Sequence, residues 1–457
     1  MKESEGLRHR RLQQPQVVSD ESRDAETKRV RSLEIRRVIR NRGKLLKMCG
    51  GKWLHYCLGW EHQCLVSGKS YKSAYSGKVF RITLTTLVVM LVVPLLLAAL
   101  LLQSPINSQT FSYKEPPLLI GPLEANLKLR EAECLYEGQL IGPESITVLG
   151  DVIFTGTADG RILKISDGKI HTLARIGKLP CGTWEDEPTC GRPLGIRLGP
   201  NGTLFVADAY YGLFEVNPVT GEVKMLVSAQ KVIQGKRMAF VNDLSITQDG
   251  RKIYFTDSSS KWQRRDNRYL VMEGTADGRL MEYDTVTQQV EVLMDDLRLA
   301  NGVQLSPAED YVLVSETTMA RIRRYHISGL RKGGHDIFFD NLPGLPDNIR
   351  PSSSGGYWVG IVVPRPNPGF SILDFLAPRP WLKNLILKLV SQEIIMKFIP
   401  KYGLVLELNE DGSVRRSFHD PHGVVVPSVS EASEHNGYLY LGSYYSPSFC
   451  QLNINEV

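Results

Sequence analysis

The stretch FVNDLSITQDGRKIYFTDSSS, residues 240–260, contains one complete unit of the pattern that decides the fold. A short motif with two polar residues leads into an apolar strand, an Asp-Gly turn and a second strand rich in β-branched and aromatic residues. Alternating strands on either side of an Asp-Gly turn are typical of a β-hairpin. The stretch therefore predicts two antiparallel strands with one buried face.

The same pattern occurs six times in the C-terminal part of the chain. The copies begin at Gly142, Arg192, Phe240, Leu299, Leu345 and Pro427. Six units at a spacing of roughly 46–59 residues, with one longer gap, predict an all-β fold, a six-bladed β-propeller over residues 120–457. Two β-sandwiches would not explain the common period, and closure into a ring also removes free sheet edges.

The longer gap, residues 370–400, reads FSILDFLAPRPWLKNLILKLVSQEIIMKFIP. From Trp381 its apolar residues follow a helical spacing, with lysines interspersed, so we expect a helical insertion before the sixth blade. Three roles fit this insertion: a core helix packed on the propeller, a lid beside the channel mouth, or a helix that lies on a membrane.

A second apolar segment precedes the repeats. Residues 82–102 read ITLTTLVVMLVVPLLLAALLL, which is long enough to cross a bilayer as one helix. Lys78 and Arg81 come just before this segment, and no Lys or Arg follows until Lys114. The positive-inside rule therefore predicts a single-pass type II signal anchor, with a cytosolic N-terminus and a luminal or extracellular propeller. Residues 103–119 form the linker.

The net charge of +6 over 457 residues divides at the same segment. Residues 1–81 hold 19 basic and 8 acidic residues, a charge of +11, and the remaining 36 basic and 41 acidic residues give −5. The arm is expected to be largely disordered, with residues 32–48 as either an amphipathic helix on a membrane or a solvated tail. A nucleic-acid role is not expected, because the membrane explains the basic arm better.

The seven cysteines divide between the two sides of the membrane. Cys49, Cys57 and Cys64 lie in the arm, where palmitoylation, metal binding and unpaired thiols remain open. In the body we expect a disulfide between Cys181 and Cys190. A second bridge, from Cys134 to Cys450, is possible because a propeller brings its two ends together. Asn201-Gly202-Thr203 is the one N-x-[ST] sequon of the chain, and it predicts glycosylation at Asn201.

Alignment of the six copies on their motif reveals a set of oxygen-bearing side chains. The first blade offers Glu144, the third Asn242, the fourth Asn301 and the fifth Asp347. Equivalent positions on the inner strands of different blades converge on the central axis. Two carboxylates and two amide oxygens suit a hard cation, and their charge matches Ca²⁺. The copies therefore predict a calcium site with places left for water and substrate.

These residues carry a family resemblance. The Glu, Asn, Asn, Asp quartet resembles the calcium site of the paraoxonase, gluconolactonase and diisopropyl-fluorophosphatase propellers. Runs across the body resemble the strictosidine synthase-like branch more closely; they are GPESI, CGRPLGI, NGTLFVADAY, FVNDL, YFTDSSSKW, DGRL, NGVQLS, PDNIRPS and EHNGYLYLGS. The resemblance implies a calcium-dependent arylesterase or lactonase-like hydrolase. It makes Asp347 a ligand and a candidate nucleophile or general base, with Asn348 as a further channel residue. The stretch 32–72 of the arm has no counterpart in the family.

Two departures from the family qualify the prediction. The plant synthase has a catalytic Glu in its sixth blade, whereas here Ser430 stands at that position and Glu431 follows it. The synthase condensation is therefore not expected. The paraoxonase histidine pair has no evident counterpart: His171 falls in the outer part of blade one, and His419 and His422 fall in an unmatched loop beside blade six. The general base stays open.

The sequence thus leaves two hypotheses. The first is a membrane-anchored hydrolase of small aryl or lipid-like esters, with Ca²⁺ as cofactor. The alternative is a binding or adhesion propeller that holds the metal for structure alone. The sequence defines neither the physiological substrate nor the choice between plasma membrane and endoplasmic reticulum.

Overall fold

The structure is a computed structural model that describes residues 75–457. The predictions for residues 32–48 and 32–72, and for Cys49, Cys57 and Cys64, lie outside the described residues. The chain divides at Pro94 into two compact units, and the second unit, Leu95–Val457, contains the whole propeller.

The predicted apolar anchor corresponds to helix α2, Tyr75–Leu101. This helix begins before the apolar run, so it includes Lys78 and Arg81, and it continues through Pro94. Its segment Gly77–Leu101 is long and apolar enough to cross a membrane. A proline is tolerated within a membrane helix when neighbouring groups satisfy the freed carbonyl.

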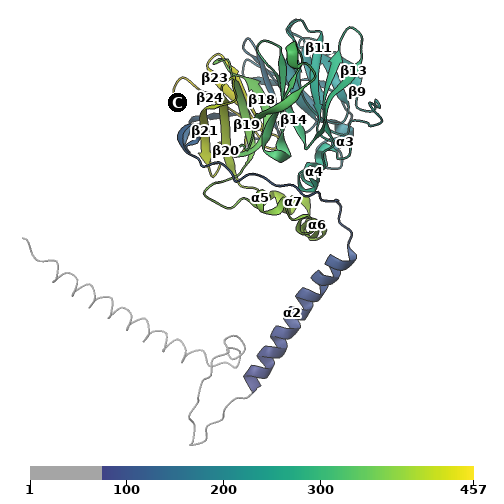
Figure 1. Cartoon of the computed structure of the whole chain (residues 1–457), viewed down its shortest axis with the longest axis vertical. Coiled ribbons are helices and arrows are strands. Elements are labelled where there is room, and N and C mark those ends of the chain that lie inside the picture. Colours follow the sequence, from purple (N-terminus) through teal and green to yellow (C-terminus); the bar gives the residue numbers. More distant parts are fainter. Residues whose placement is uncertain (1–74) are drawn as a thin grey trace, which may run out of the picture. The chain divides into compact units, whose positions relative to one another are not determined.

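The prediction of a six-bladed β-propeller is confirmed (Figure 1). Six four-stranded antiparallel sheets surround the axis, and the first repeat residues of every copy lead into the innermost strand of a blade. Blades one to three contain β2 Ile146–Leu149, β3 Val152–Gly156, β4 Arg161–Ser166, β5 Lys169–Arg175, β6 Pro193–Leu198, β7 Leu204–Asp208, β8 Gly212–Val216, β9 Val223–Ser228, β10 Val241–Ile246, β11 Lys252–Asp257, β12 Gly278–Asp284 and β13 Val290–Leu297. Blades four to six contain β14 Ala300–Leu305, β15 Tyr311–Glu316, β16 Arg321–His326, β17 His335–Phe339, β18 Gly344–Pro351, β19 Tyr357–Pro364, β20 Tyr402–Leu408, β21 Val414–Pro421, β22 Glu431–His435, β23 Tyr438–Gly442, β24 Phe449–Asn453 and β1 Glu133–Leu135.

The ring closes through the sixth blade, whose order is β1-β24-β23-β22. The N-terminal strand β1 thus pairs antiparallel with the last strand of the chain, and Cys134 lies opposite Cys450 in this register. The two cysteines form a disulfide. The bridge that the sequence left open is therefore present, and it fastens the seam of the ring.

The core consists of apolar layers between successive blades. Phe154 of blade one packs with Ile196 and Val206 of blade two, and Phe449 of blade six packs with Ile146 of blade one. Further buried clusters join each remaining pair of neighbouring blades. Each β-sheet thus buries both faces, which agrees with the β-branched and aromatic strands of the repeat.

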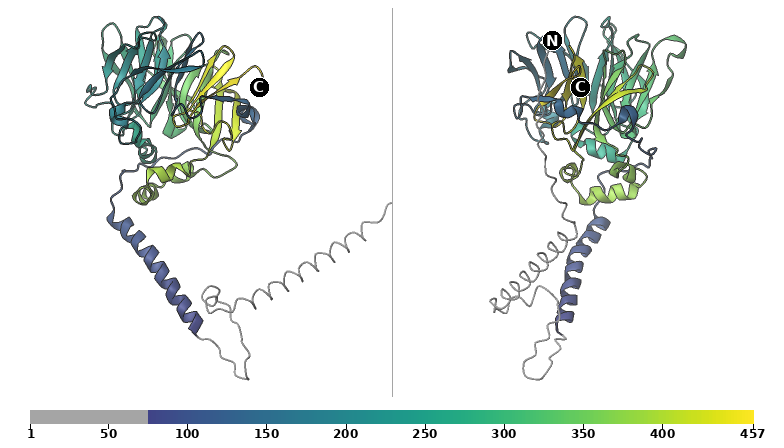
Figure 2. Two further views of the ribbon diagram at one scale, coloured as in Figure 1. Left: turned by 180° about the vertical axis from the view of Figure 1, so that it is seen from behind. Right: turned by 90° about the vertical axis from the view of Figure 1, so that its left-hand side faces the viewer.

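Short helices gather at one end of the propeller, as Figure 1 and the two views of Figure 2 show. They are α3 Glu187–Cys190, α4 Asn267–Glu273, α5 Ile372–Leu376, α6 Pro380–Leu389 and α7 Gln392–Met396. Elsewhere and among them, 3-10 turns occur at Gly121–Leu123, Lys128–Glu131, Arg264–Asp266, Thr317–Met319 and Gly329–Arg331. The insertion 370–400 is therefore three helices instead of one. Pro380 starts α6, and Ser391 caps α7 by accepting a hydrogen bond from the Ile394 N–H.

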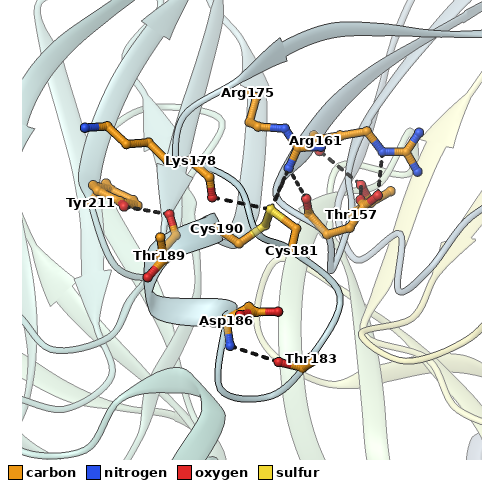
Figure 3. Close-up of a disulfide and its surroundings, with 11 residues drawn as sticks. Thr157, Arg161, Arg175, Lys178, Cys181, Thr183, Asp186, Thr189, Cys190 and Tyr211 are labelled. Carbon is orange, nitrogen blue, oxygen red and sulfur yellow. Dashed lines mark hydrogen bonds and ion pairs between the residues drawn. A yellow bond between two sulfur atoms is a disulfide. The ribbon is translucent and has the colours of Figure 1, made fainter.

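A disulfide joins Cys181 to Cys190 in the loop that carries α3 (Figure 3). The Tyr211 hydroxyl donates to the Thr189 carbonyl at 2.8 Å and anchors this loop to blade two. Glu187 of the same loop accepts from the Tyr210 hydroxyl at 2.6 Å. The disulfide therefore closes a loop whose buried carboxylate reaches toward the helical end of the propeller.

Candidate functional site

A β-bulge recurs near the start of four inner strands. The pairing register shifts within Pro193–Ile196, Val241–Leu244, Ala300–Val303 and Pro346–Ile349. An extra residue in one strand re-aims the side chains beside it, and bulges often occur next to functional sites. The repeat motif of the sequence is therefore a repeated bulge, which turns one side chain of each strand toward the axis.

The structure brings all four predicted metal-ligating residues to one cavity. Asn242, Asn301 and Asp347 follow the first residue of their bulges. Glu144 lies just before β2, separated from it by Ser145, and all four line the cavity. Close approach of the inner strands requires Gly302, since a Cβ there would lie 2.5 Å from the Asp347 carbonyl oxygen. Leu194 of blade two holds the equivalent place, so the ring of oxygen donors is open on that side.

The cavity is about 560 Å³ and mostly apolar. Its walls near the strands include Phe240, Leu299 and Leu345. The rest of the wall comes from the helical insertion, whose contributing residues are Ile372, Leu373, Leu376, Ile386, Val390, Ile395, Phe398, Ile399 and Pro400. The insertion therefore covers the channel mouth, while the predicted oxygen donors lie at the strand end of the cavity.

Three buried oxygens in the cavity lack partners. Within residues 75–457, the side-chain Oδ1 atoms of Asn242, Asn301 and Asp347 accept no hydrogen bond. The Asn242 amide nitrogen donates to Ser258 Oγ at 3.0 Å, which leaves the amide oxygen for another ligand. A buried acceptor without a partner costs free energy, and three such acceptors that line one cavity call for a ligand such as water or an ion. Carboxylate and amide oxygens are the donors that Ca²⁺ takes, so these residues fit a hard cation.

The two carboxylates are electrostatically strained without a cation. Burial raises the pKa of Asp347 well above its usual value, and the negative charge of Glu144 raises it further. Burial also raises the pKa of Glu144, although Arg192 opposes the shift from 3.5 Å. A bound divalent cation would favour the ionised form of both groups.

The composition of the site restricts which metals it suits. Across residues 75–457 there is no cluster of three or more His, Cys, Asp or Glu side chains placed to hold an ion. Two carboxylates and two amides offer no nitrogen or sulfur ligand, which disfavours Zn²⁺ and leaves the oxygen-binding ions.

Beneath the cavity lies a second polar layer, formed by the neighbours of the quartet. Arg350 donates from Nη1 to Asp243 Oδ2 at 2.7 Å and from Nη2 to Ser145 Oγ at 3.1 Å, and it also pairs with Glu431. Arg197 adds a contact of 3.6 Å to Asp243. All of these groups except Arg197 are almost fully buried. The layer closes the channel with paired charges.

Asn348 and Glu431 belong to this lower layer. The Asn348 side-chain amide donates to Glu431 Oε2 at 3.0 Å, and Asn348 is not among the residues that line the cavity. Glu431 also accepts from the Ile146 N–H at 2.9 Å. The carboxylate that follows the expected blade-six position is therefore part of a buried ion pair and does not face the cavity.

The histidines lie away from the cavity. His171 is in β5, the outer strand of blade one. The expectation that His419 lies in an unmatched loop is wrong, because it lies in β21, the outer strand of blade five. There its ring contacts Tyr402 Oη at 2.9 Å and Ser417 Oγ at 2.8 Å, and burial lowers its pKa to about 4. His422 follows in the next turn, and no described histidine lines the cavity.

Three further residues of the cavity were not predicted from the sequence. Arg264 pairs with Glu187 of the disulfide-closed loop at 3.1 Å and lines the cavity, as do Arg268 and Tyr444. Burial raises the pKa of Tyr444 to about 12. Only the fold places Arg264 and Arg268 beside the quartet.

The fold and these residues define a six-bladed propeller of the strictosidine synthase-like class. Residues 121–165 match the model described as "Strictosidine synthase-like, N-terminal", and residues 228–330 match the strictosidine synthase model. Adipocyte plasma membrane-associated protein of Homo sapiens is 66% identical over 385 residues, which cover 84% of this chain and 92% of that one. The Gallus gallus protein of the same name is 61% identical over 457 residues and covers both chains completely. The expectation that residues 32–72 have no counterpart in the family is therefore wrong, because this relative matches the whole arm. The chain belongs to the adipocyte plasma membrane-associated protein family.

Among solved structures, a gluconolactonase of Xanthomonas campestris is similar, with a TM-score of 0.48 and 17% identity. The match covers 76% of this chain and 98% of that one. A likeness at this level says nothing about activity or bound metal.

Proposed function

We propose that this protein is a membrane-anchored, calcium-dependent hydrolase of aryl or lipid-like esters. The observation that carries the proposal is the set of three unpartnered buried oxygens, on Asn242, Asn301 and Asp347, at the deep end of an apolar cavity. Bound there, Ca²⁺ would polarise an ester carbonyl and stabilise the oxyanion. Glu144 and Asp347 would supply the charge that holds the ion.

The walls of the cavity support the class of substrate. Phe240, Leu299 and the apolar side chains of the insertion suit an aromatic ring or an acyl chain, and they exclude water from the deep end. Asp347 lies within its bulge and lines the cavity, and it is the candidate nucleophile or base. Arg264, fixed by Glu187, adds positive charge to the same wall.

Phenyl acetate hydrolysis by the purified full chain tests the proposal. We expect activity with calcium, its loss with chelator, and its loss in Asp347→Asn. Asp249→Asn is the matched control, because this exposed residue lies in a turn far from the cavity. Activity that is indifferent to both chelator and Asp347→Asn would exclude a catalytic metal.

A second candidate function is a propeller that binds an apolar ligand without turnover. The observation that favours it is that no described histidine lines the cavity, so a dedicated general base is missing. The two candidates separate in one experiment: an uncleaved ester would be recovered intact from the protein, whereas the hydrolase would release its acid and alcohol.

We further propose the type II orientation, with the N-terminus in the cytosol and the propeller luminal or extracellular. The charges before α2, two disulfides and the sequon at Asn201 support it. Asn201 is exposed in the turn that follows β6, which is the end of the blade opposite the helices. In cells, glycosidase treatment should increase the mobility of the wild-type chain but not of Asn201→Gln. A wild-type chain unaffected by glycosidase would contradict glycosylation at this site.

A further inference from the structure

The helical insertion has two apolar faces, and only one of them is used by the propeller. The inner face lines the cavity, with Leu376, Ile386 and Ile395 among its members. The outer face consists of large apolar side chains that stay exposed in the described chain, and three of them are strongly exposed: Phe398 at 77%, Phe370 at 68% and Trp381 at 65%. Phe398 and Ile372 lie at the rim, where they also border the cavity. Ile372, Phe375, Leu389 and Ile394 are exposed as well. We call these seven side chains the outer apolar face.

Basic residues accompany this face. Arg379 lies over the Phe375 ring at 4.1 Å, and Lys397 is exposed beside Phe398. Aromatic and aliphatic side chains interspersed with Lys and Arg are typical of helices that lie in the headgroup region of a bilayer. Lys397 fits a headgroup region better than the centre of a protein interface, where Lys is depleted.

The linker ties the insertion to the apolar anchor at short range. Ile106 is buried in one cluster with Met272, Leu376 and Leu387, only five residues beyond the end of α2 at Leu101. Five residues span at most about 18 Å when fully extended. Any membrane that α2 crosses must therefore have its surface within a short distance of the insertion.

Hydrogen bonds fasten the same linker to helix α6. Asn384 Oδ1 accepts from Ser104 Oγ at 3.4 Å and from the Ser108 N–H at 3.3 Å. Lys383, which is buried, donates to the Gln109 carbonyl at 2.8 Å. These hydrogen bonds hold the linker along α6. The linker therefore cannot extend enough to let the insertion move far from a bilayer that α2 crosses.

We propose that the outer apolar face of α5–α7 lies in the surface of the bilayer that anchors the chain. The opposite end of the propeller, with the turn after β6 and the β8–β9 turn, then points into the aqueous compartment. If the cavity binds lipid-like esters, as proposed above, its mouth opens at the membrane and takes the ligand from lipid; that consequence rests on the proposed function, whereas the docking itself does not.

Fluorescence quenching by brominated lipid tests the docking in the full chain. The protein is reconstituted in phosphatidylcholine vesicles with bromine on the acyl chains near the glycerol, and the difference between wild type and Trp381→Phe isolates the emission of Trp381. We expect quenching of this emission by at least about twofold, because an interfacial side chain sits at that depth. The tryptophans common to both proteins cancel in the difference.

The control is Val219→Trp in the Trp381→Phe background. Val219 is 80% exposed in the turn between β8 and β9, at the opposite end of the blade from the insertion. Its emission should be unaffected by bromine. Equal quenching at both positions, or none at Trp381, would overturn the proposal, and a second copy of the chain that covers the face would also leave Trp381 unquenched. No step of the measurement depends on ester hydrolysis, so its outcome is independent of the proposed activity.

Discussion

Two polar layers lie one residue apart in the channel, and they differ in how their charges are satisfied. In the upper layer, Asn242 and Asp347 present oxygens that no described group pairs. In the lower layer, Asp243, which follows Asn242 in the chain, is paired with Arg350 at 2.7 Å. The same bulges supply both layers. The paired charges of the lower layer favour stability, whereas the unpartnered oxygens of the upper layer are available to the cation proposed above.

Replacement of Arg350, the positively charged side chain at the centre of the lower layer, should have the largest effect on stability. Arg350→Met leaves Asp243 and Glu431 buried without a counter-charge, so we expect the free energy of unfolding to fall by about 3–5 kcal/mol. Thermal unfolding of the purified chain measures the change. Arg251→Met is the control. The Arg251 side chain is 55% exposed, so its ion pair with Asp284 contributes little to stability. Equal unfolding temperatures of the two variants would refute the stabilising role of the layer.

The same chemical change in each layer should have opposite consequences. Asp347→Asn should lower phenyl acetate hydrolysis by at least about 100-fold, the scale set by loss of electrostatic stabilisation of the oxyanion. In chelator it should leave the unfolding temperature equal or higher, since it removes a buried charge beside Glu144. Asp243→Asn should instead lower the unfolding temperature. A destabilised Asp347→Asn protein in chelator would show that the upper layer is structural too.

Calcium should stabilise the protein through the upper layer. At a concentration 100 times the dissociation constant we expect a gain of about 2.7 kcal/mol, measured as a calcium-dependent rise in unfolding temperature. Asn301→Leu removes one proposed ligand at similar volume and should reduce this rise without reducing stability in chelator. A rise of the same size in the variant would place the ion elsewhere.

The smallest effect should be the pH dependence of the calcium-free protein. Burial and Glu144 raise the pKa of Asp347 in the folded state. A group with a raised folded-state pKa contributes stability below its unfolded pKa, and this contribution is lost as the pH rises through the folded pKa. In chelator, wild type should therefore lose stability relative to Asp347→Asn as the pH rises, and the two should converge at low pH, where Asp347 is protonated. Parallel unfolding curves at all pH values would argue against a strained carboxylate.

The sequence predicts the upper layer better than the lower one, and the reason is physical. Repeat-equivalent positions of Glu144, Asn242 and Asp347 are visible in one chain because every blade uses the same motif. The bulges that orient these side chains depend on the pairing register between neighbouring strands. Local sequence patterns do not determine that register. Arg350 pairs with Asp243 across 107 positions of the chain, so no local pattern announces it.

The features outside the channel also differ in how well the local sequence predicts them. The Cys181–Cys190 bridge was predictable because the two residues share a short loop, whereas the Cys134–Cys450 bridge follows from the closure of the ring. His419 looked like a loop residue because its strand, β21, follows a long insertion that interrupts the repeat. The insertion itself was predicted as helical, but the breaks at Pro380 and Ser391 divide it into separate helices.

The seam of the ring has a consequence for the time course of synthesis. Strand β1 is made before any blade, yet its partner β24 is 316 residues further along the chain. At about 5–20 residues per second, β1 waits for roughly 15–60 seconds before the ring can close. During that interval Cys134 has no partner, while Cys181 meets Cys190 nine residues later. The order of translation therefore makes the local bridge the first that can form and the seam the last, so any chain interrupted before residue 450 is an open ring.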